Sequence, residues 1–410
     1  MSSTPLLSFS EAKNLILQTA QSINYQQTES IKLFDAVNRI AAKPIISPMN
    51  IPSFDNSAMD GYAIREADLQ NSHLLPIADS VFAGQKQINN WPKNSCLRIM
   101  TGAVVPKDAY AVIMQENVQK IDQAIRFDPE KIKAGQNIRY IGESVCAGSE
   151  VFPAGEKLTI AKLTTLATLG LSEITVYKPI KVAIFSTGDE LTPIGEKLPS
   201  VNSIYDSNRF TVQLMLKALG CEIIDFGIIK DDLDLISNTL KQASKEADIV
   251  VTSGGVSVGD ADYTKMALAQ IGEIDFWKIA MKPGKPFAFG KINNALFCGL
   301  PGNPVSTFVT CYQLVRPLIL ALYKQNSHTN TFILKTVSNL KKSVGRLDFQ
   351  RGYVHANENG ELVVSSTGEQ GSHITSSFNQ ANCFIVLEAE RGNITQGELV
   401  TVEMFDSFLL

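Results

Sequence analysis

The sequence has few of the residues from which structural zinc sites are built. Its 410 residues include six cysteines and four histidines, and no two cysteines form a Cys-x-x-Cys pair. Cys221, Cys298 and Cys311 lie in apolar stretches, where reduced cysteines commonly pack in a core. We therefore do not expect structural zinc, although the cysteine count alone leaves disulfides open.

The chain also lacks a strong charge of either sign. Its formal net charge is −4, and no cluster of lysine and arginine indicates a nucleic-acid footprint or a membrane-binding face. We expect neither a signal peptide nor an apolar run of membrane-spanning length, and hence a cytoplasmic protein. Without a global positive field, an anionic ligand must be held by a few placed cations and backbone amides.

A chain of this length is too long for one ordinary core, and its first half changes pattern twice. Ser8-x-x-Glu11 predicts a capped helix, a second amphipathic stretch covers about 29–42, and helical spacing returns at about 145–179. Between them, short strand-like runs predict a largely β segment. These patterns predict a discontinuous helical domain I (1–45 and 145–179) with an inserted β-rich domain II (46–144).

The second half predicts an α/β domain III (180–326) followed by a small C-terminal β-barrel or β-sandwich as domain IV (327–410). The expected strands are 181–185, 221–226, 248–252 and about 274–280, with a hairpin at 286–299. The expected helices are about 207–219, 232–246, a short one from 262, and 303–322. Alternation of this kind indicates a mostly parallel sheet, whose ligands bind beyond the carboxyl ends of the strands.

Four loops rich in glycine or proline each stand at the end of an apolar run. They are 186–191, 253–262, 281–286 and 299–306. Three of them follow expected strands, so the fold would bring them to one edge of the sheet. Glycine lets backbone N–H groups approach an anion closely, and the loops also carry hydroxyls, carboxylates and lysines. This combination predicts an enzyme site for a phosphorylated, metal-bearing ligand, although neither Walker nor Rossmann glycine spacing occurs.

Each loop also has a purely structural explanation. Asp260 or Asp262 could cap a helix, but one cap explains one carboxylate and leaves the glycines unexplained. A solvated Pro-Gly turn would account equally well for Lys278, Lys282 and Lys285, whose position between two other candidate loops favours anion binding.

Two carboxylate pairs follow expected strands and could either hold Mg²⁺ or begin a helix. Asp189 and Glu190 are the better metal candidates, and Asp231 with Asp232 fits a helix start.

Nine stretches of the chain, in order, resemble the molybdopterin molybdenumtransferase family, which is MoeA in bacteria and includes the gephyrin E domain of animals. Three of them, 57–63, 101–103 and 139–143, would pass for ordinary turns by themselves. The matching stretches are 57–63, 101–103, 139–143, 186–191, 253–265, 281–290, 299–306, 350–352, and 371–373 with Ser376-Ser377.

The resemblance implies the four domains given above, with domain III of the molybdopterin-binding type. It implies a homodimer in which the 57–63 motif faces the α/β domain of the partner. The family reaction uses Mg²⁺, molybdate and adenylylated molybdopterin, and yields molybdenum cofactor and AMP. Molybdopterin adenylyltransferase is then the expected pathway partner.

The resemblance also implies roles for individual residues. Asp189, Glu190, Asp260 and Asp262 would hold Mg²⁺. The pterin and the nucleotide phosphates would contact Ser253, Gly254, Gly255, Ser257, Gly259, Asp260, Lys285, Pro301, Pro304 and Ser306. Molybdate or the terminal phosphate would meet Lys278, Lys282, Arg351 and Ser372. The expected catalytic group is Asp60, Thr101, Glu190, Asp231, Asp262, Lys278 and Lys282, with Asp60 and Thr101 supplied by the other subunit.

Two other functions compete with this interpretation. Adenylyl transfer from ATP to molybdopterin uses a similar Ser-Gly-Gly loop, but such enzymes resemble only 180–322, and here the flanking regions carry motifs of their own. A scaffold role, as in gephyrin, has no partner segment or long linker to support it.

Overall fold

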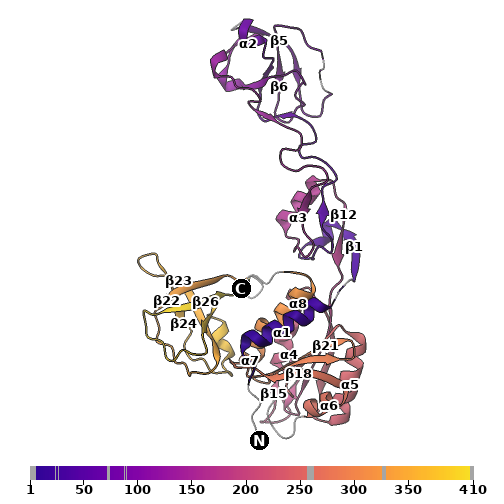
Figure 1. Cartoon of the computed structure of the whole chain (residues 1–410), viewed down its shortest axis with the longest axis vertical. Helices are drawn as coiled ribbons and strands as arrows, with labels where there is room; N and C mark the ends of the chain where they lie inside the picture. Colours follow the sequence, from indigo (N-terminus) through magenta and orange to yellow (C-terminus); the bar gives the residue numbers. More distant parts are fainter. Residues whose placement is uncertain are drawn as a thin grey trace. The chain divides into compact units, whose positions relative to one another are not determined.

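The computed structural model describes residues 6–23, 25, 27–71, 74–86, 88, 90–255, 263–325 and 329–406 (Figure 1). The chain divides into two compact units. Unit 1 is Met1–Glu29, Asn38–Ile40 and Val176–Leu410, and unit 2 is Ser30–Val37 and Ala41–Thr175. The four domains expected from the sequence do not follow this division, because residues 1–29 of expected domain I fall in unit 1 and residues 145–175 fall in unit 2.

Unit 2 contains a six-stranded sheet in the order β7-β4-β6-β5-β9-β8. Its strands are β4 (Gly61–Ile64), β5 (Leu74–Val81), β6 (Cys96–Ile99), β7 (Ala111–Met114), β8 (Gln119–Ile121) and β9 (Ala124–Arg126). Tyr62, Leu97, Ile99 and Ile113 are among the buried side chains of its core. The expected β-rich character of this segment is confirmed.

The remainder of unit 2 is less helical than the sequence predicts. The α-helices in the described part of unit 2 are α3 (Ile160–Thr168) and the short α2 (Asp68–Asn71). The paired strands are β2 (Ile45–Ile46) with β11 (Glu150–Phe152), and β3 (Asn56–Ser57) with β10 (Ile138–Arg139). The amphipathic stretch 29–42 is mainly β1 (Thr28–Lys32) and a 3₁₀ turn at Leu33–Ala36. Pairing of β1 with β12 (Glu173–Tyr177) overrides the local helical pattern.

The central sheet of unit 1 has the order β16-β13-β17-β21-β20-β18. The first four strands run parallel, and β20 is antiparallel to both of its neighbours. The strands are β13 (Lys181–Thr187), β16 (Glu222–Ile229), β17 (Ile249–Ser253), β18 (Gly272–Lys278), β20 (Pro286–Ile292) and β21 (Ala295–Leu300). Strands β17 and β21 are buried along their whole length, as expected for parallel strands covered on both faces.

Helices α4 (Ser207–Ala218), α5 (Leu233–Glu246) and α6 (Tyr263–Ile271) connect the strands of this sheet. The α/β pattern predicted from the sequence is therefore confirmed, with element ends shifted by a few residues. The N-terminal helix α1 (Phe9–Ser22) also belongs to unit 1, and its first turn has the predicted capping box between Ser8 and Glu11.

One segment contradicts the expectation that no apolar run reaches membrane-spanning length. Pro304–Leu322 has 19 residues and a mean hydropathy of 1.5. It consists of α7 (Pro304–Thr310), a π-helical turn at Cys311–Val315 and α8 (Arg316–Leu322). Because 83% of this window is buried inside the protein, its apolar composition is that of a core helix, and length and composition alone are weak evidence for a span.

The C-terminal part of unit 1 is a closed five-stranded barrel. Its strands are β22 (Thr331–Thr336), β23 (Leu347–Ala356), β24 (Leu362–Ser366), β25 (Cys383–Leu387) and β26 (Leu399–Met404). The ring closes because β23 pairs with both β24 and β25. A sixth strand, β19 (Met281–Lys282), comes from the α/β part and pairs in parallel with β23. The predicted C-terminal barrel is confirmed.

Candidate functional site

Three of the glycine-rich loops meet at the carboxyl edge of the parallel sheet, as the sequence predicts. The strand register places Ser186 opposite Ser253, and Ser253 opposite Leu300. A cavity of about 80 Å³ lies between the loops. Its lining includes Thr187, Glu190, Asp206, Asn208, Ser253, Gly254, Gly302 and Pro304.

Two glycines of this edge are required by the backbone and by their surroundings. Gly254 and Gly255 have φ values of +87° and +65°, which disfavour other residues. A Cβ atom on Gly255 would lie 2.1 Å from the hydroxyl oxygen of Thr264 and 2.9 Å from that of Thr187. These two hydroxyls are buried and have no hydrogen-bond partner within the described part of the chain. Such groups are costly unless a ligand or water satisfies them, so the edge suits an oxygen-rich ligand.

One wall of this cavity is held by a buried polar network that the sequence analysis missed. The Ser186 hydroxyl donates a hydrogen bond to Asp206 at 2.9 Å, and both residues are buried. Asp206 also caps α4 by accepting from the Arg209 backbone, and it accepts from Arg209 Nε at 2.7 Å. Because Asp206 directly precedes the helix predicted at about 207–219, the sequence alone could have indicated this N-cap. Its contact with Ser186 depends on the tertiary fold.

The predicted metal-binding carboxylates are only partly described. The Asp231 backbone donates to Asp189 Oδ1 at 3.3 Å. Burial, and then the charges of Asp189 and Glu190, raise the pKa of Asp231. Within the described ranges, no three metal-ligating side chains form a group that could hold an ion. Ser257, Gly259, Asp260 and Asp262 lie outside the described residues.

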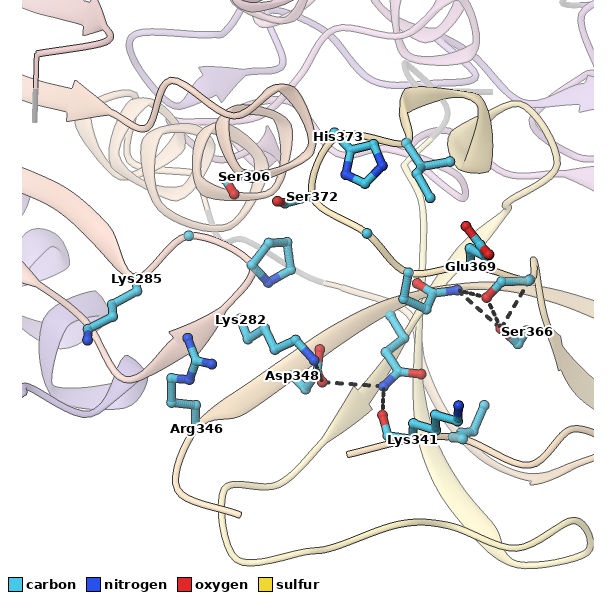
Figure 2. A pocket seen from close by; sticks show the side chains of 18 of the residues that line it. Lys282, Lys285, Ser306, Lys341, Arg346, Asp348, Ser366, Glu369, Ser372 and His373 are labelled. Carbon is cyan, nitrogen blue, oxygen red and sulfur yellow. Dashed lines mark hydrogen bonds and ion pairs between the residues drawn. The ribbon is translucent and has the colours of Figure 1, made fainter. Parts of the chain in front are cut away.

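A second and larger cavity of about 880 Å³ lies between the β19–β20 loop and the barrel (Figure 2). Its four lysine and arginine side chains are Lys282, Lys285, Lys341 and Arg346. The predicted residues Ser306 and Ser372 also line it, as do Asp348, Glu369 and His373. Sequence reasoning missed Lys341, Arg346, Asp348 and Glu369, which lie in the barrel outside the stretches that matched the family.

The loop that carries Ser372 is fastened to the α/β part of unit 1. The Val305 backbone N–H donates to the Ser372 carbonyl at 3.1 Å, and the rings of Phe308 and Phe378 stack with centroids 3.9 Å apart. Helix α7 therefore positions Ser372 beside Ser306. This arrangement brings the last two predicted anion-binding serines together.

Arg351 lies behind this loop and is absent from the lining of the cavity. It is buried, and it donates from Nε to the Ser377 hydroxyl at 3.0 Å and from Nη2 to the Gly371 carbonyl at 3.3 Å. Burial lowers the pKa of Arg351 to about 10. In this structure its contacts support the Ser372 loop.

Two further predicted residues of unit 1 lie next to the cavities without lining them. Lys278 is exposed at the end of β18, opposite Pro286 in the strand register. Pro301 is buried after β21, and its carbonyl accepts a hydrogen bond from the Thr307 hydroxyl.

Asp60 and Thr101 form a pair on the surface of unit 2. Asp60 precedes β4 and Thr101 follows β6, and these strands are antiparallel neighbours. The Thr101 backbone N–H and hydroxyl donate to Asp60 Oδ1 at 2.8 and 2.7 Å. These hydrogen bonds lower the pKa of Asp60. The carboxylate is therefore ionised, oriented and exposed.

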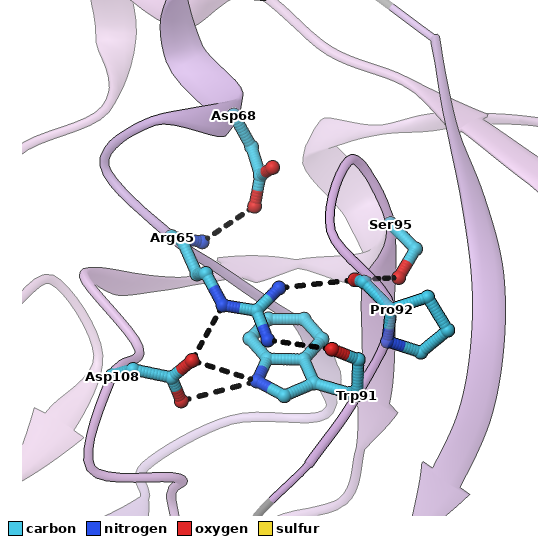
Figure 3. A network of polar contacts seen from close by, with 6 residues as sticks. All are labelled: Arg65, Asp68, Trp91, Pro92, Ser95 and Asp108. Carbon is cyan, nitrogen blue, oxygen red and sulfur yellow. Dashed lines mark hydrogen bonds and ion pairs between the residues drawn. The ribbon is translucent and has the colours of Figure 1, made fainter.

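Unit 2 also contains a polar network with a structural role (Figure 3). The Arg65 guanidinium lies 3.6 Å from the centroid of the Trp91 ring, and both side chains donate to Asp108. Arg65 also donates to the carbonyls of Trp91 and Pro92. Burial raises the pKa of Asp108, but the hydrogen bonds from Arg65 and Trp91 outweigh it and leave the pKa below its ordinary value.

Unit 1 thus combines an α/β sheet and a five-stranded barrel with two cavities, one lined by oxygen-bearing side chains and one by lysines and an arginine. Residues 183–321 match the family described as a probable molybdopterin binding domain. The flanking residues 7–170 match the MoeA N-terminal region (domain I and II), and 334–405 match the MoeA C-terminal region (domain IV).

Individual relatives extend over nearly the whole chain. A molybdopterin molybdenumtransferase of Haemophilus influenzae is 53% identical, over 93% of this chain and 95% of its own length. Gephyrin of Dictyostelium discoideum is 34% identical over 95% of this chain, which spans 61% of that protein. A solved MoeA structure from Pyrococcus horikoshii is 27% identical, with a TM-score of 0.84 over 98% of this chain and 100% of that one. The chain belongs to the MoeA family of molybdopterin molybdenumtransferases.

Proposed function

We propose that this chain inserts molybdate into adenylylated molybdopterin, cleaves the phosphoanhydride with release of AMP, and so produces molybdenum cofactor. One observation carries the proposal: the loop after β21 and the first turn of α7 line both cavities, with Gly302 and Pro304 in the small one and Ser306 in the large one. A phosphorylated ligand held by the small cavity would therefore extend toward the cationic one.

The small cavity supplies the features that phosphate groups require. Gly255 brings the backbone close to the cavity at the end of β17, and the Thr187 and Thr264 hydroxyls have no hydrogen-bond partner within the described residues. Phosphoanhydride cleavage depends mainly on positioning and on neutralising charge. The oxygen-rich set around Asp189 and Glu190 suits Mg²⁺, which would neutralise phosphate charge when bound. Asp260 and Asp262 would complete that set.

The large cavity supplies cations for molybdate, which is a tetrahedral dianion. Lys282 and Lys285 line one side of the cavity, and Ser306 and Ser372 add hydroxyl groups. Charge-assisted hydrogen bonds from such groups are the strong ones. The dithiolene sulfurs of the pterin would bind the metal, so protein thiols are not needed, and five of the six cysteines are indeed buried.

We further propose a cytoplasmic homodimer in which Asp60 and Thr101 complete the cleft of the partner subunit. An exposed, ionised carboxylate held by two hydrogen bonds is well suited to act on a ligand outside its own unit. Molybdopterin adenylyltransferase would supply the adenylylated substrate.

The decisive experiment measures AMP release from adenylylated molybdopterin with Mg²⁺, with and without molybdate. We expect release that depends on molybdate, with molybdenum appearing on the pterin. Lys282→Gln should abolish the AMP release that depends on molybdate. Lys291→Gln, which is on β20 and outside the large cavity, should leave that release unchanged. Formation of adenylyl-pterin from ATP and molybdopterin, without AMP release, would assign this chain to the preceding reaction.

A further inference from the structure

The backbone itself places Lys282 beside Asp348. Strand β19 leaves the α/β part of unit 1 and pairs in parallel with β23 of the barrel, with Lys282 directly opposite Asp348. The Leu347 N–H donates to the Ala280 carbonyl at 3.0 Å, which fastens the same junction. The proximity of the two side chains is thus set by strand register.

Asp348 is a buried carboxylate with few partners. Its side chain is 5% exposed, whereas that of Lys282 is 41% exposed. Lys282 Nζ lies 3.3 Å from Asp348 Oδ2, and Gln350 Nε2 donates to the same oxygen at 3.3 Å. Among the described residues, Lys282 is the only cation within ion-pair distance.

Two other cations, Lys342 and Arg351, interact electrostatically with Asp348, and both are engaged elsewhere: Arg351 donates to the Ser377 hydroxyl and to the Gly371 carbonyl. The Lys342 ammonium donates to the carbonyls of Ser343 and Arg346 at 3.0 and 2.9 Å. Removing the partner of a buried, ionised carboxylate costs folding free energy. The ion pair between Asp348 and Lys282 is therefore favoured in the folded protein. Figure 2 shows Lys282 reaching toward Asp348 at the wall of the large cavity.

We propose that Asp348 is a positioning residue: an internal counter-anion that holds the Lys282 ammonium at the cavity wall and that competes for this ammonium with an entering oxyanion without releasing it. The inference rests on the proposed function, because it assigns molybdate to this cavity. Asp348 neutralises Lys282 while the cavity is empty, which weakens molybdate binding. It also fixes the ammonium where the bound oxyanion needs it, which favours the reaction.

The two effects are separable in Asp348→Asn. Molybdate no longer has to compete with Asp348 for the Lys282 ammonium, so its affinity should rise about fivefold. The ammonium is no longer fixed, so kcat should fall by roughly tenfold. In Asp348→Asn the KM for molybdate and kcat should therefore both fall. A variant that merely disturbed the fold would lose kcat without binding molybdate more tightly. Asp348→Glu keeps the charge and should bind molybdate within about twofold of the wild type.

The test is titration calorimetry with molybdate at constant low ionic strength, using full-length Asp348→Asn, Lys282→Gln and the double variant, each checked by urea unfolding. The gain in affinity from Asp348→Asn should vanish when Lys282 is Gln. Glu369→Gln is the matched control, because it removes a carboxylate that lines the same cavity. Any gain from that change should persist in the Lys282→Gln background.

Three results would overturn the inference. A gain that survives in the double variant would mean that Asp348 acts by general repulsion. Equal or weaker binding by Asp348→Asn would mean that it does not compete with the oxyanion. If molybdate bound to neither the wild type nor the variant, the proposed binding of molybdate in this cavity would itself be wrong. The first two results contradict only the role of Asp348.

Discussion

Thr101 donates both its backbone N–H and its hydroxyl to a single oxygen of Asp60, at 2.8 and 2.7 Å. The two residues are 41 positions apart and meet because β4 and β6 are antiparallel neighbours. An exposed carboxylate normally samples several rotamers. Here two hydrogen bonds from one residue keep it in a single orientation on the surface of unit 2.

Loss of the Thr101 hydroxyl should raise the pKa of Asp60 toward its ordinary value. Thr101→Val preserves the shape of the side chain and keeps the backbone N–H, so the pKa should rise only part of the way. Carboxyl-carbon NMR titration measures this directly. Thr101→Ser retains the hydroxyl and should titrate like the wild type; a pKa unchanged in Thr101→Val would mean that the hydroxyl contributes nothing.

Asp60→Asn tests the proposed role of the carboxylate in the reaction. Asp60 is only partly buried, so the urea midpoint should stay close to that of the wild type. Molybdate-dependent AMP release should nevertheless be lost. Normal turnover by this variant would exclude Asp60 from the reaction.

Gly255→Ala should destabilise the carboxyl edge of the sheet. The residue has a φ of +65°, and the new Cβ would clash with Thr264. We expect a loss of about 3 kcal/mol in urea unfolding, together with loss of substrate binding. Gly302→Ala is the matched control, since no atom lies within 4 Å of its added Cβ and its φ is not positive. Equal destabilisation by both changes would refute the steric explanation.

Arg351→Met should loosen the loop that carries Ser372. It leaves the Gly371 carbonyl without the Arg351 Nη2 bond and the Ser377 hydroxyl without the Nε bond, and we expect a cost of about 2 kcal/mol. Arg351→Lys should not rescue it, because an ammonium cannot reproduce the guanidinium fork. Hydrogen exchange of residues 371–378 is the measurement. Protection like that of the wild type in the Lys variant would contradict the forked geometry.

Asp108→Asn should destabilise unit 2 in a pH-dependent way. The folded-state pKa of Asp108 lies below its unfolded value, so its contribution is present above that unfolded value and is lost as pH falls through the folded one. Because the side chain is 47% exposed, solvent screening limits the effect to about 1 kcal/mol at neutral pH.

The free energies of unfolding of Asp108→Asn and the wild type should therefore differ at pH 7, begin to converge as pH falls below about 4, and meet below the folded-state pKa of Asp108. Glu66→Gln, an exposed carboxylate of the same unit, should show no such difference. A difference that persisted in acid would point to packing around Trp91 instead of charge.

The local sequence pattern was sufficient to predict many of the helices and strands of this protein. Strands β13, β17 and β21 each contain a continuous apolar run, so their burial and the α/β alternation could be predicted from the sequence. Parallel strands present their carboxyl ends at one edge of the sheet. This general rule predicted that the loops containing Thr187, Ser253 and Gly302 would lie together, and all three residues line the small cavity. The capping box at Ser8 is likewise local.

The tertiary structure alone decided the features that depend on pairing between distant segments. Thr28–Lys32 is a strand because β12 is beside it, despite a helical pattern. Lys282 meets Asp348 because β19 joins the barrel, and Arg351 is buried beneath the Ser372 loop because that loop folds over it. The periodicity of apolar residues in the sequence indicates which face of a helix or strand is buried. Which strands pair, and in which register, depends on the free energy of the whole fold.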